Sequence, residues 1–322
     1  MNKYTDYFGI DISKDSFDVI NLQGKHFLFQ NDKNGFSEFL KIIPKGSLCV
    51  MEVTGIYHLH LANFLHLKNI AVSVVNPLRI KRFSQMHLRR NKTDKADAKM
   101  ISLYAQTQDV DLWTPPHEIL DRCKDIYQVM EQYVNIKKSL NNKLVSLKYK
   151  KSEDFLIDNI SNQIQLVTEA IEELELELID LIKGYNLTLF SNLKSIVGIG
   201  NRTAILLIIT TNGFKHFENA KQLSSYFGFA PTELSSGKSI RGSRKISKMG
   251  NPLVREKLYM CSLQAFRSNK ACSELYQRLI AKGKPKKLAL IAVANKLLKI
   301  AYAIAKSGLP YDPEYKSVRI IS

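Results

Sequence analysis

Four carboxylates in the first third of the chain stand at positions where they could bind metal ions together. Asp11 and Glu52 each end an apolar segment typical of a buried strand, FGIDIS and VMEVTG. Asp94 and Asp97 lie three residues apart in NKTDKADAKMIS, and this spacing puts both on one face of a helix. Functional groups collect at the carboxyl ends of parallel strands, so we expect the four side chains to converge.

A cluster of this kind requires a cation. Two carboxylates about 4 Å apart repel by about 4 kcal/mol at an effective dielectric constant of 20. Oxygen ligands favour Mg²⁺ or Mn²⁺ over zinc, and the three motifs contain no histidine or cysteine. Two such ions would stabilise the attacking and leaving oxygens of an in-line phosphoryl displacement. Taken singly, each acid could instead be a helix or turn cap, a first-turn helix residue or a solvated side chain.

A second stretch with chemical potential is ELSSGKSIRGSRKISK, residues 233–248, in which serines and basic residues are interleaved. Its basic residues are Lys238, Arg241, Arg244, Lys245 and Lys248, and its serines are Ser235, Ser236, Ser239, Ser243 and Ser247. The stretch either only binds phosphate or also supplies a nucleophile. A serine hydroxyl needs a base or a metal ion to activate it. No His–Asp pair lies nearby in the sequence, so a protease-like triad is poorly supported.

The charge of the chain indicates a polyanionic partner. Its formal net charge is +17, and between residues 235 and 300 sixteen basic residues stand against two acids, Glu256 and Glu274. Binding to phosphates releases their counterions, so nucleic acid is the expected partner of this region. The alternative is a basic surface that serves only solubility, but the interleaved Gly and Ser residues favour phosphate binding.

The elements that must position these groups divide the chain into three parts. Residues 1–115 show three consecutive strand patterns and then alternating helix and strand patterns, which predicts a mixed sheet with helices on its faces. The helix expected over 34–44 begins at an Asn cap and stops at Pro44. Residues 116–185 carry heptad-spaced apolar residues on both sides of a polar break, which predicts an antiparallel coiled-coil hairpin. That hairpin could be a spacer or a dimer interface.

Residues 186–322 are expected to be mainly helical, and they open on a glycine motif, SIVGIG. Gly198 and Gly200 resemble the turn of a helix-hairpin-helix, where glycines let the backbone approach a phosphate at a helix N-terminus. The alternative is a tight turn between two helices with no ligand.

The location of the protein is also predicted from composition. No apolar run approaches the ~20 residues that a bilayer requires, so no transmembrane helix is expected. The first residues lack the apolar core of a signal peptide. The four cysteines are scattered, which suggests reduced, mostly buried thiols in a cytoplasmic protein.

Several of these motifs, taken together, resemble those of a known family over nearly the whole chain. They are GIDISKDSFDV, EVTGIYH, VVNPLRIKRFSQ, KTDKADAKMI, SIVGIG, FGFAPTELSSGKSIRG, SKMGNPLVREKLYM and LPYDPE. In this order they are similar to the DEDD transposases of the IS-one-ten family of insertion sequences and to the related Piv DNA invertases. The resemblance implies an N-terminal domain like RuvC, the Holliday-junction resolvase of the RNase H-like superfamily. Its four DEDD letters fall on Asp11, Glu52, Asp94 and Asp97.

The resemblance also implies a nucleophile and partners that composition does not show. The family carries a proposed nucleophilic serine immediately before a glycine, which is Ser236 here, although the doubled SSG leaves Ser235 as a competing candidate. Members act on donor and target DNA, select it with a structured noncoding bridge RNA, and form dimers or tetramers with composite active sites. A bacterial, nucleoid-associated location follows. Arg241 and Arg244 could clamp phosphates bidentately while Lys238 adds a point charge.

Two other classes of function stay open from the sequence. One is a RuvC-like nuclease that hydrolyses junctions with metal-activated water and uses no serine. The other is a nucleic-acid-binding scaffold in which the acids are only structural. Within the recombinases, transposition and site-specific inversion are both possible.

Overall fold

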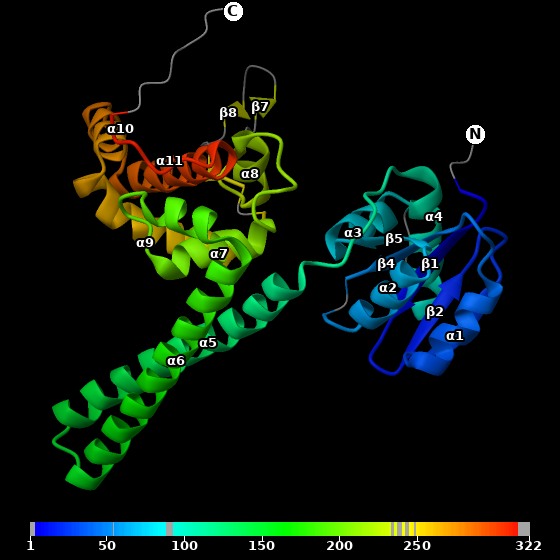
Figure 1. Cartoon of the computed structure of the whole chain (residues 1–322), viewed down its shortest axis with the longest axis horizontal. Coiled ribbons are helices and arrows are strands. Elements are labelled where there is room, and N and C mark those ends of the chain that lie inside the picture. Colours follow the sequence, from blue (N-terminus) through cyan, green and yellow to red (C-terminus); the bar gives the residue numbers. More distant parts are fainter. Residues whose placement is uncertain are drawn as a thin grey trace, which may run out of the picture. The chain divides into compact units, whose positions relative to one another are not determined.

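The computed structural model describes residues 4–53, 55–87, 93–232, 235–236, 240–241, 245–247 and 249–314. The chain divides into two compact units, Met1–Pro115 and Pro116–Ser322, which are coloured along the sequence in Figure 1. Two consecutive prolines stand at the division. The fixed φ of proline and its missing amide hydrogen end regular structure at such a point.

The first unit contains a five-stranded mixed sheet in the order β3-β2-β1-β4-β5. β1 (Tyr7–Ile12), β2 (Ser16–Ile20) and β3 (His26–Gln30) form an antiparallel meander. β4 (Leu48–Glu52) and β5 (Ala71–Val75) run parallel to β1. The three consecutive strands and the later strands in βαβ units were predicted from the sequence, and the structure confirms them.

Four helices cover the two faces of this sheet. They are α1 (Lys33–Ile42), α2 (His58–Leu67), α3 (Pro77–Met86) and α4 (Asp94–Thr107). One face packs a phenylalanine-rich core, which includes Phe8, Phe17 and Phe39, against α1 and α2. The opposite face packs α3 and α4 on a second core, which includes Val50 and Ile101. Strand residues alternate between these two cores, as the pleat requires.

The start of α1 differs from the sequence prediction. The capping residue is Asp32, whose Oδ1 accepts a hydrogen bond from the Gly35 amide at 2.8 Å. Asn34 lies inside the first turn, so the predicted Asn cap was wrong by two positions. Both residue types favour N-caps, and the sequence offered DKN as adjacent choices. The helix ends at Ile42, two residues before Pro44.

The second unit is helical apart from four two-residue strands among its described residues. Its helices are α5 (Glu118–Tyr149), α6 (Asp154–Lys194), α7 (Asn201–Thr211), α8 (Ala220–Tyr226), α9 (Pro252–Ser268), α10 (Lys270–Ala281) and α11 (Lys286–Ser307). α5 and α6 pack against each other in opposite directions, and only four residues, 150–153, join them (Figure 1). The polar break in the sequence corresponds to this turn.

One core joins the helical hairpin to the helices that follow it. Tyr127 of α5 and Leu178 of α6 belong to the same buried cluster as residues of α7, α9 and α11. α6 is interrupted at Asn186, which has non-helical angles (φ −163°, ψ 90°) and whose Oδ1 accepts from the Leu189 amide at 2.9 Å. The side chain therefore caps the C-terminal part of α6 after the interruption.

α11 is the one described helix that is long and apolar enough to cross a membrane by length and composition. The prediction that no such segment exists was therefore too strict. Its apolar residues include Val293, Leu297 and Ala301, all fully buried in the core of the second unit. A helix buried among other helices is apolar for the same reason as a membrane helix, so its packing explains its composition.

Candidate active site

Strand alternation brings the first two predicted acids to the same face of the sheet. On β1, Phe8 and Ile10 point into the core under α1 and α2, so Asp11 projects from the opposite face. On β4, Leu48 and Val50 belong to the core under α3 and α4, and Glu52 continues that face. Asp11 and Glu52 therefore lie near the carboxyl ends of two adjacent parallel strands, on the α4 side.

The other two acids come from the first turn of α4. Thr93 caps this helix, because its Oγ1 accepts from the Ala96 amide at 3.2 Å. The cap fixes Asp94 and Asp97 in the first turn, where the helix dipole favours negative charge. α4 packs directly on β1, so its acidic end lies over the strand that carries Asp11. This placement supports the predicted convergence.

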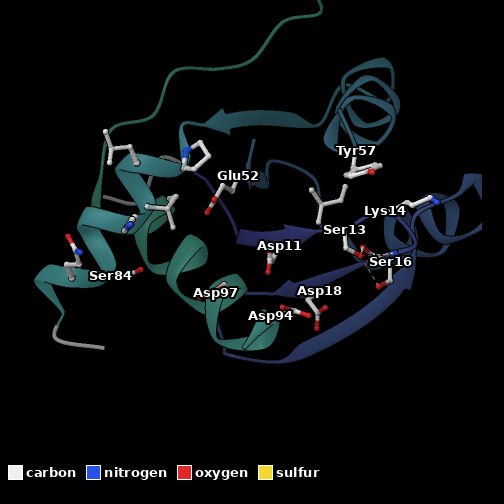
Figure 2. Close-up of a pocket in the computed structure, with 16 residues that line it drawn as sticks. Asp11, Ser13, Lys14, Ser16, Asp18, Glu52, Tyr57, Ser84, Asp94 and Asp97 are labelled. Atoms are coloured by element: carbon white, nitrogen blue, oxygen red, sulfur yellow. Dashed lines mark hydrogen bonds between the residues drawn. The ribbon is translucent and has the colours of Figure 1, made fainter. Parts of the chain in front are cut away.

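A pocket of about 820 Å³ contains all four acids in its lining (Figure 2). A fifth carboxylate, Asp18 of β2, also lines it. Lys14, Tyr57 and Lys81 contribute cationic and aromatic groups to the same pocket. A pocket lined by carboxylates, lysines and an aromatic side chain is suited to a phosphorylated substrate that contacts metal ions bound by the carboxylates.

The electrostatics of Asp11 show that these acids act on one another. Burial and then the charges of Asp97, Asp94, Glu52 and Asp18, in that order, raise the pKa of Asp11 to about 6. Repulsion among carboxylates penalises the ionised form, so Asp11 stays protonated to higher pH than an isolated aspartate. A perturbed carboxyl of this kind in a pocket is typical of a functional site.

Asp18 was missed by the sequence analysis. It faces Asp11 directly across the β1–β2 ladder, and its Oδ1 lies 2.6 Å from Nε2 of His26 on β3. The signal was present, because Asp18 sits in the strand pattern FDVIN with Phe17 and Val19 on the buried side. Its relation to Asp11 depends on the hairpin register, which the sequence alone does not determine.

The pocket acids fit a divalent ion by their chemistry but not by their present spacing. All five pocket acids offer carboxylate oxygen, the ligand that Mg²⁺ and Mn²⁺ prefer. Among the residues that the structure describes, no three Asp, Glu, His or Cys side chains are grouped tightly enough to hold an ion as they stand. Mutual repulsion keeps carboxylates apart, and attraction to a cation acts in the opposite direction. The residue types and the shared pocket therefore fit the ion, whereas the present spacing does not yet form its coordination shell.

The serine stretch forms two short antiparallel ladders in the second unit. β7 (Ser235–Ser236) pairs with β8 (Ile240–Arg241), so Ser236 stands opposite Ile240. β6 (Pro231–Thr232) pairs with β9 (Lys245–Ile246). The predicted site residues Lys238, Arg244 and Lys248, and also Ser239 and Ser243, lie outside the described residues. The backbone thus puts Ser236 in a two-residue antiparallel ladder with β8.

Arg255 on α9 links the backbone that precedes this stretch to the backbone that follows it. Its Nη1 donates to the carbonyl of Phe227 at 2.9 Å and to the carbonyl of Gly250 at 3.0 Å. Gly250 is required at its position, because its φ is +129° and a Cβ there would lie 2.1 Å from the Tyr226 carbonyl oxygen. Arg255 lies in the motif SKMGNPLVREKLYM but was not among the site residues predicted from the sequence.

The two glycines of the GIG motif have different surroundings. Gly198 has φ +105°, and a Cβ there would lie 2.8 Å from the Ala265 Cβ of α9. Its packing against α9 matches the tight-turn alternative. Gly200 caps α7, and a Cβ there would meet no atom within 4 Å. A phosphate contact at either residue stays a prediction.

Comparison with known proteins agrees with the fold and the acidic pocket. A family described as "Transposase", of the DEDD type of IS110 elements, matches residues 8–147. The family described as "Transposase IS116/IS110/IS902 family" matches residues 190–277. Over 318 residues the chain is 30% identical to the pilin gene-inverting protein of Moraxella lacunata, covering 95% of this chain and 97% of that protein. The namesake from Moraxella bovis gives the same values.

A shorter similarity links the chain to an insertion element. It is 28% identical over 159 residues to the insertion element IS110 uncharacterized 43.6 kDa protein of Streptomyces coelicolor, covering 49% of this chain and 38% of that protein. The site and these matches define an enzyme that cleaves and rejoins DNA strands. The chain belongs to the IS110 family of transposases. The match over residues 8–147 makes the N-terminal part of the chain a RuvC-like DEDD transposase domain, a type that typically depends on a divalent metal ion, and DNA is the partner of the protein.

Proposed function

We propose that this chain exchanges DNA strands through Ser236, with Mg²⁺ or Mn²⁺ held by Asp11, Glu52, Asp94 and Asp97. The observation that carries the proposal is the convergence of these four carboxylates on one pocket, where burial and then the neighbouring charges raise the pKa of Asp11. Such an arrangement is costly for the fold and becomes favourable when a divalent cation binds to it. Ser235 is the alternative nucleophile.

The chain's own residues account for the strand-transfer step. The Ser236 hydroxyl gives up its proton to solvent, its Oγ bonds to phosphorus, and the bond from phosphorus to one DNA oxygen breaks with uptake of a proton. The product is a phosphoserine bond, and attack by a DNA hydroxyl in the reverse sense rejoins the strand and frees Ser236. Bound divalent ions would stabilise negative charge at the phosphoryl group and lower the pKa of the hydroxyl.

Exposed basic side chains of the second unit support nucleic-acid binding. They include Arg278, Lys282, Lys284, Lys286, Lys287 and Lys299. Arg241, Lys245 and the other basic residues of the serine stretch would add contacts to DNA phosphates beside Ser236. Part of this charge would bind a structured noncoding bridge RNA encoded beside the gene. The protein would act as a dimer or tetramer, in which the serine of one protomer completes the acidic pocket of another.

The proposal is tested with purified protein, Mg²⁺, transcribed flanking RNA and labelled DNA that carries the ends of the element. Ser236→Ala is expected to abolish both the covalent protein–DNA adduct and strand exchange, a loss of at least about 10³-fold. Ser235→Ala is the matched control and is expected to retain both activities. Asp11→Asn is expected to abolish cleavage.

The same experiment distinguishes the other classes of function. A Ser236→Ala variant that still cleaves DNA would identify a junction nuclease that uses water. Strand exchange by Asp11→Asn would show that the acids are structural. An adduct that persists in Ser236→Ala and disappears in Ser235→Ala would move the nucleophile by one residue.

The proposed reaction can result in transposition or inversion. The similarity to pilin gene-inverting proteins over nearly the full chain favours testing inversion directly. A plasmid with two copies of the recombination site in inverted orientation reports inversion by a change of restriction pattern. A plasmid with one donor copy and an empty target reports transposition.

A further inference from the structure

Asp18 is an acid that the DEDD motif does not include, although it lies at the same pocket. It is the register partner of Asp11 in the antiparallel β1–β2 ladder. Directly opposite residues on one sheet face have Cβ atoms about 4.5–5.5 Å apart, and like charges in this relation destabilise the ladder. Both side chains also line the same pocket, so the two carboxylates act on each other. Such a cost at a pocket indicates a functional purpose.

His26 holds the Asp18 carboxylate in place. Its Nε2 donates to Oδ1 of Asp18 at 2.6 Å, and the side chains are 28% and 15% exposed, respectively. His26 pairs with Ile20, two residues beyond Asp18 on β2, so both side chains project from the same face of the sheet. The bond occupies one oxygen of Asp18 and leaves the other oxygen for the pocket, which Asp18 lines (Figure 2).

We propose that Asp18 is a further carboxylate ligand of the divalent ions in this pocket, direct or through a water molecule, and that His26 is its positioning residue. The inference rests on the proposed metal site at Asp11. Mg²⁺ and Mn²⁺ take six oxygen ligands, and carboxylates that bind them are commonly oriented by a second hydrogen bond. His26 supplies such a bond from outside the pocket lining.

A purely structural role for the pair predicts a different result. In that case the Asp18–His26 bond would only tie β2 to β3, and its loss would lower the free energy of unfolding without changing ion affinity. An asparagine at position 18 still offers an oxygen to His26, so Asp18→Asn retains the cross-strand bond and removes only the charge. A glutamine at position 26 still offers an N–H to Asp18, whereas a leucine does not.

The test is a titration of the full-length protein with Mn²⁺, in which the free ion is measured by electron paramagnetic resonance without DNA. Asp18→Asn and His26→Leu are expected to weaken Mn²⁺ binding about 10-fold or more, because loss of a ligand or of its hydrogen-bonding partner has effects of this size. His26→Gln is expected to bind within about 3-fold of the natural protein. Asp15→Asn removes an exposed charge outside the pocket lining and is expected to bind Mn²⁺ normally.

Each outcome supports or overturns the inference. Melting temperatures measured in chelator show whether each variant folds. If Asp18→Asn does not fold, comparison of His26→Leu with His26→Gln still tests the proposal, because both variants retain Asp18. Unchanged Mn²⁺ affinity in a folded Asp18→Asn would overturn the role of Asp18 as a ligand, and unchanged affinity in His26→Leu would overturn the positioning role of His26. Asp11→Asn distinguishes failure of the metal site from failure of the role of Asp18. If Asp11→Asn binds Mn²⁺ normally, the proposed metal site itself is wrong. If Asp11→Asn loses Mn²⁺ binding while Asp18→Asn binds normally, only the role of Asp18 is refuted.

Discussion

Gly9 on β1 and Ser102 on α4 approach so closely that a Cβ on Gly9 would lie 2.1 Å from the Ser102 backbone nitrogen. The Ser102 hydroxyl also donates to the Tyr7 carbonyl of β1 at 3.3 Å. These contacts fix α4 against the strand that carries Asp11, with Asp94 and Asp97 at the near end of the helix. A glycine two residues before Asp11 therefore sets the distance between strand and helix on which the pocket depends.

Gly9→Ala is expected to destabilise the first unit by at least about 3 kcal/mol, because the added methyl group meets backbone rather than a mobile side chain. If the protein folds, displacement of α4 is expected to weaken Mn²⁺ binding. Gly24→Ala is the matched control in the same unit, since nothing lies within 4 Å of that Cβ and only its φ of +80° opposes the change. Urea unfolding measures both variants, and equal stabilities would contradict the close packing at Gly9.

The metal-free protein is expected to lose stability as the pH rises through the titration of Asp11. Its pKa is about 6 in the folded protein and about 3.8 in the unfolded chain, so between these values the folded state binds more protons. The free energy of unfolding therefore falls with rising pH in this window and stays lower above it. One pKa unit corresponds to 1.36 kcal/mol, and solvent screening of this partly exposed group reduces the total to about 1–2 kcal/mol.

Asp11→Asn is the comparison that isolates this effect. In chelator, the variant is expected to be more stable than the natural protein at pH 8 and equally stable at pH 4. Mg²⁺ favours the ionised carboxylate, so its addition at pH 8 should stabilise the natural protein and not the variant. Parallel pH profiles of the two proteins in urea unfolding would show that Asp11 does not carry the shift.

Much of the first unit could be predicted, because its strands are apolar segments ended by distinct turn residues. Alternation along such strands is enough to put Asp11 and Glu52 on one face, and the three-residue spacing puts Asp94 and Asp97 together. Asp18 could not be placed in this way, because its neighbour depends on the register of a hairpin. Asp32 and Asn34 show a similar limit at the start of α1, where two good capping residues lie close together.

The second unit was less predictable from the sequence. Heptad spacing indicated two long helices, but the interruption at Asn186 arises from its own side-chain cap, which no periodicity reports. Arg255 bonds to the carbonyls of Phe227 and Gly250, and Phe227 lies more than twenty positions before the other two residues. In a basic protein, composition leads one to expect that arginines bind phosphate. It therefore gives no sign that Arg255 bonds to backbone carbonyls instead.

Arg255 is expected to position the serine stretch, because it alone bonds to both of the carbonyls that flank that stretch among the described contacts. Arg255→Lys keeps the charge but loses the planar fork of donors. It is expected to lower adduct formation at Ser236 about 10-fold with Mn²⁺ affinity unchanged. Arg267→Lys is the control on the same helix. If Arg255→Lys forms adduct at the normal rate while Arg255→Met does not, the residue acts through its charge, as in a DNA contact.

Substitutions at Gly198 and Gly200 are expected to distinguish a packing role from a phosphate-binding role within the GIG motif. Gly198→Ala should destabilise the second unit by about 2 kcal/mol or more, because the new methyl group would lie 2.8 Å from the Ala265 Cβ at φ +105°. Gly200→Ala meets open space at φ −91° and should cost less than about 1 kcal/mol. Salt-dependent DNA binding then tests the second role. Weaker binding by a stably folded Gly200→Ala would support close approach of its backbone to phosphate, and unchanged binding would leave the motif as a turn between α6 and α7.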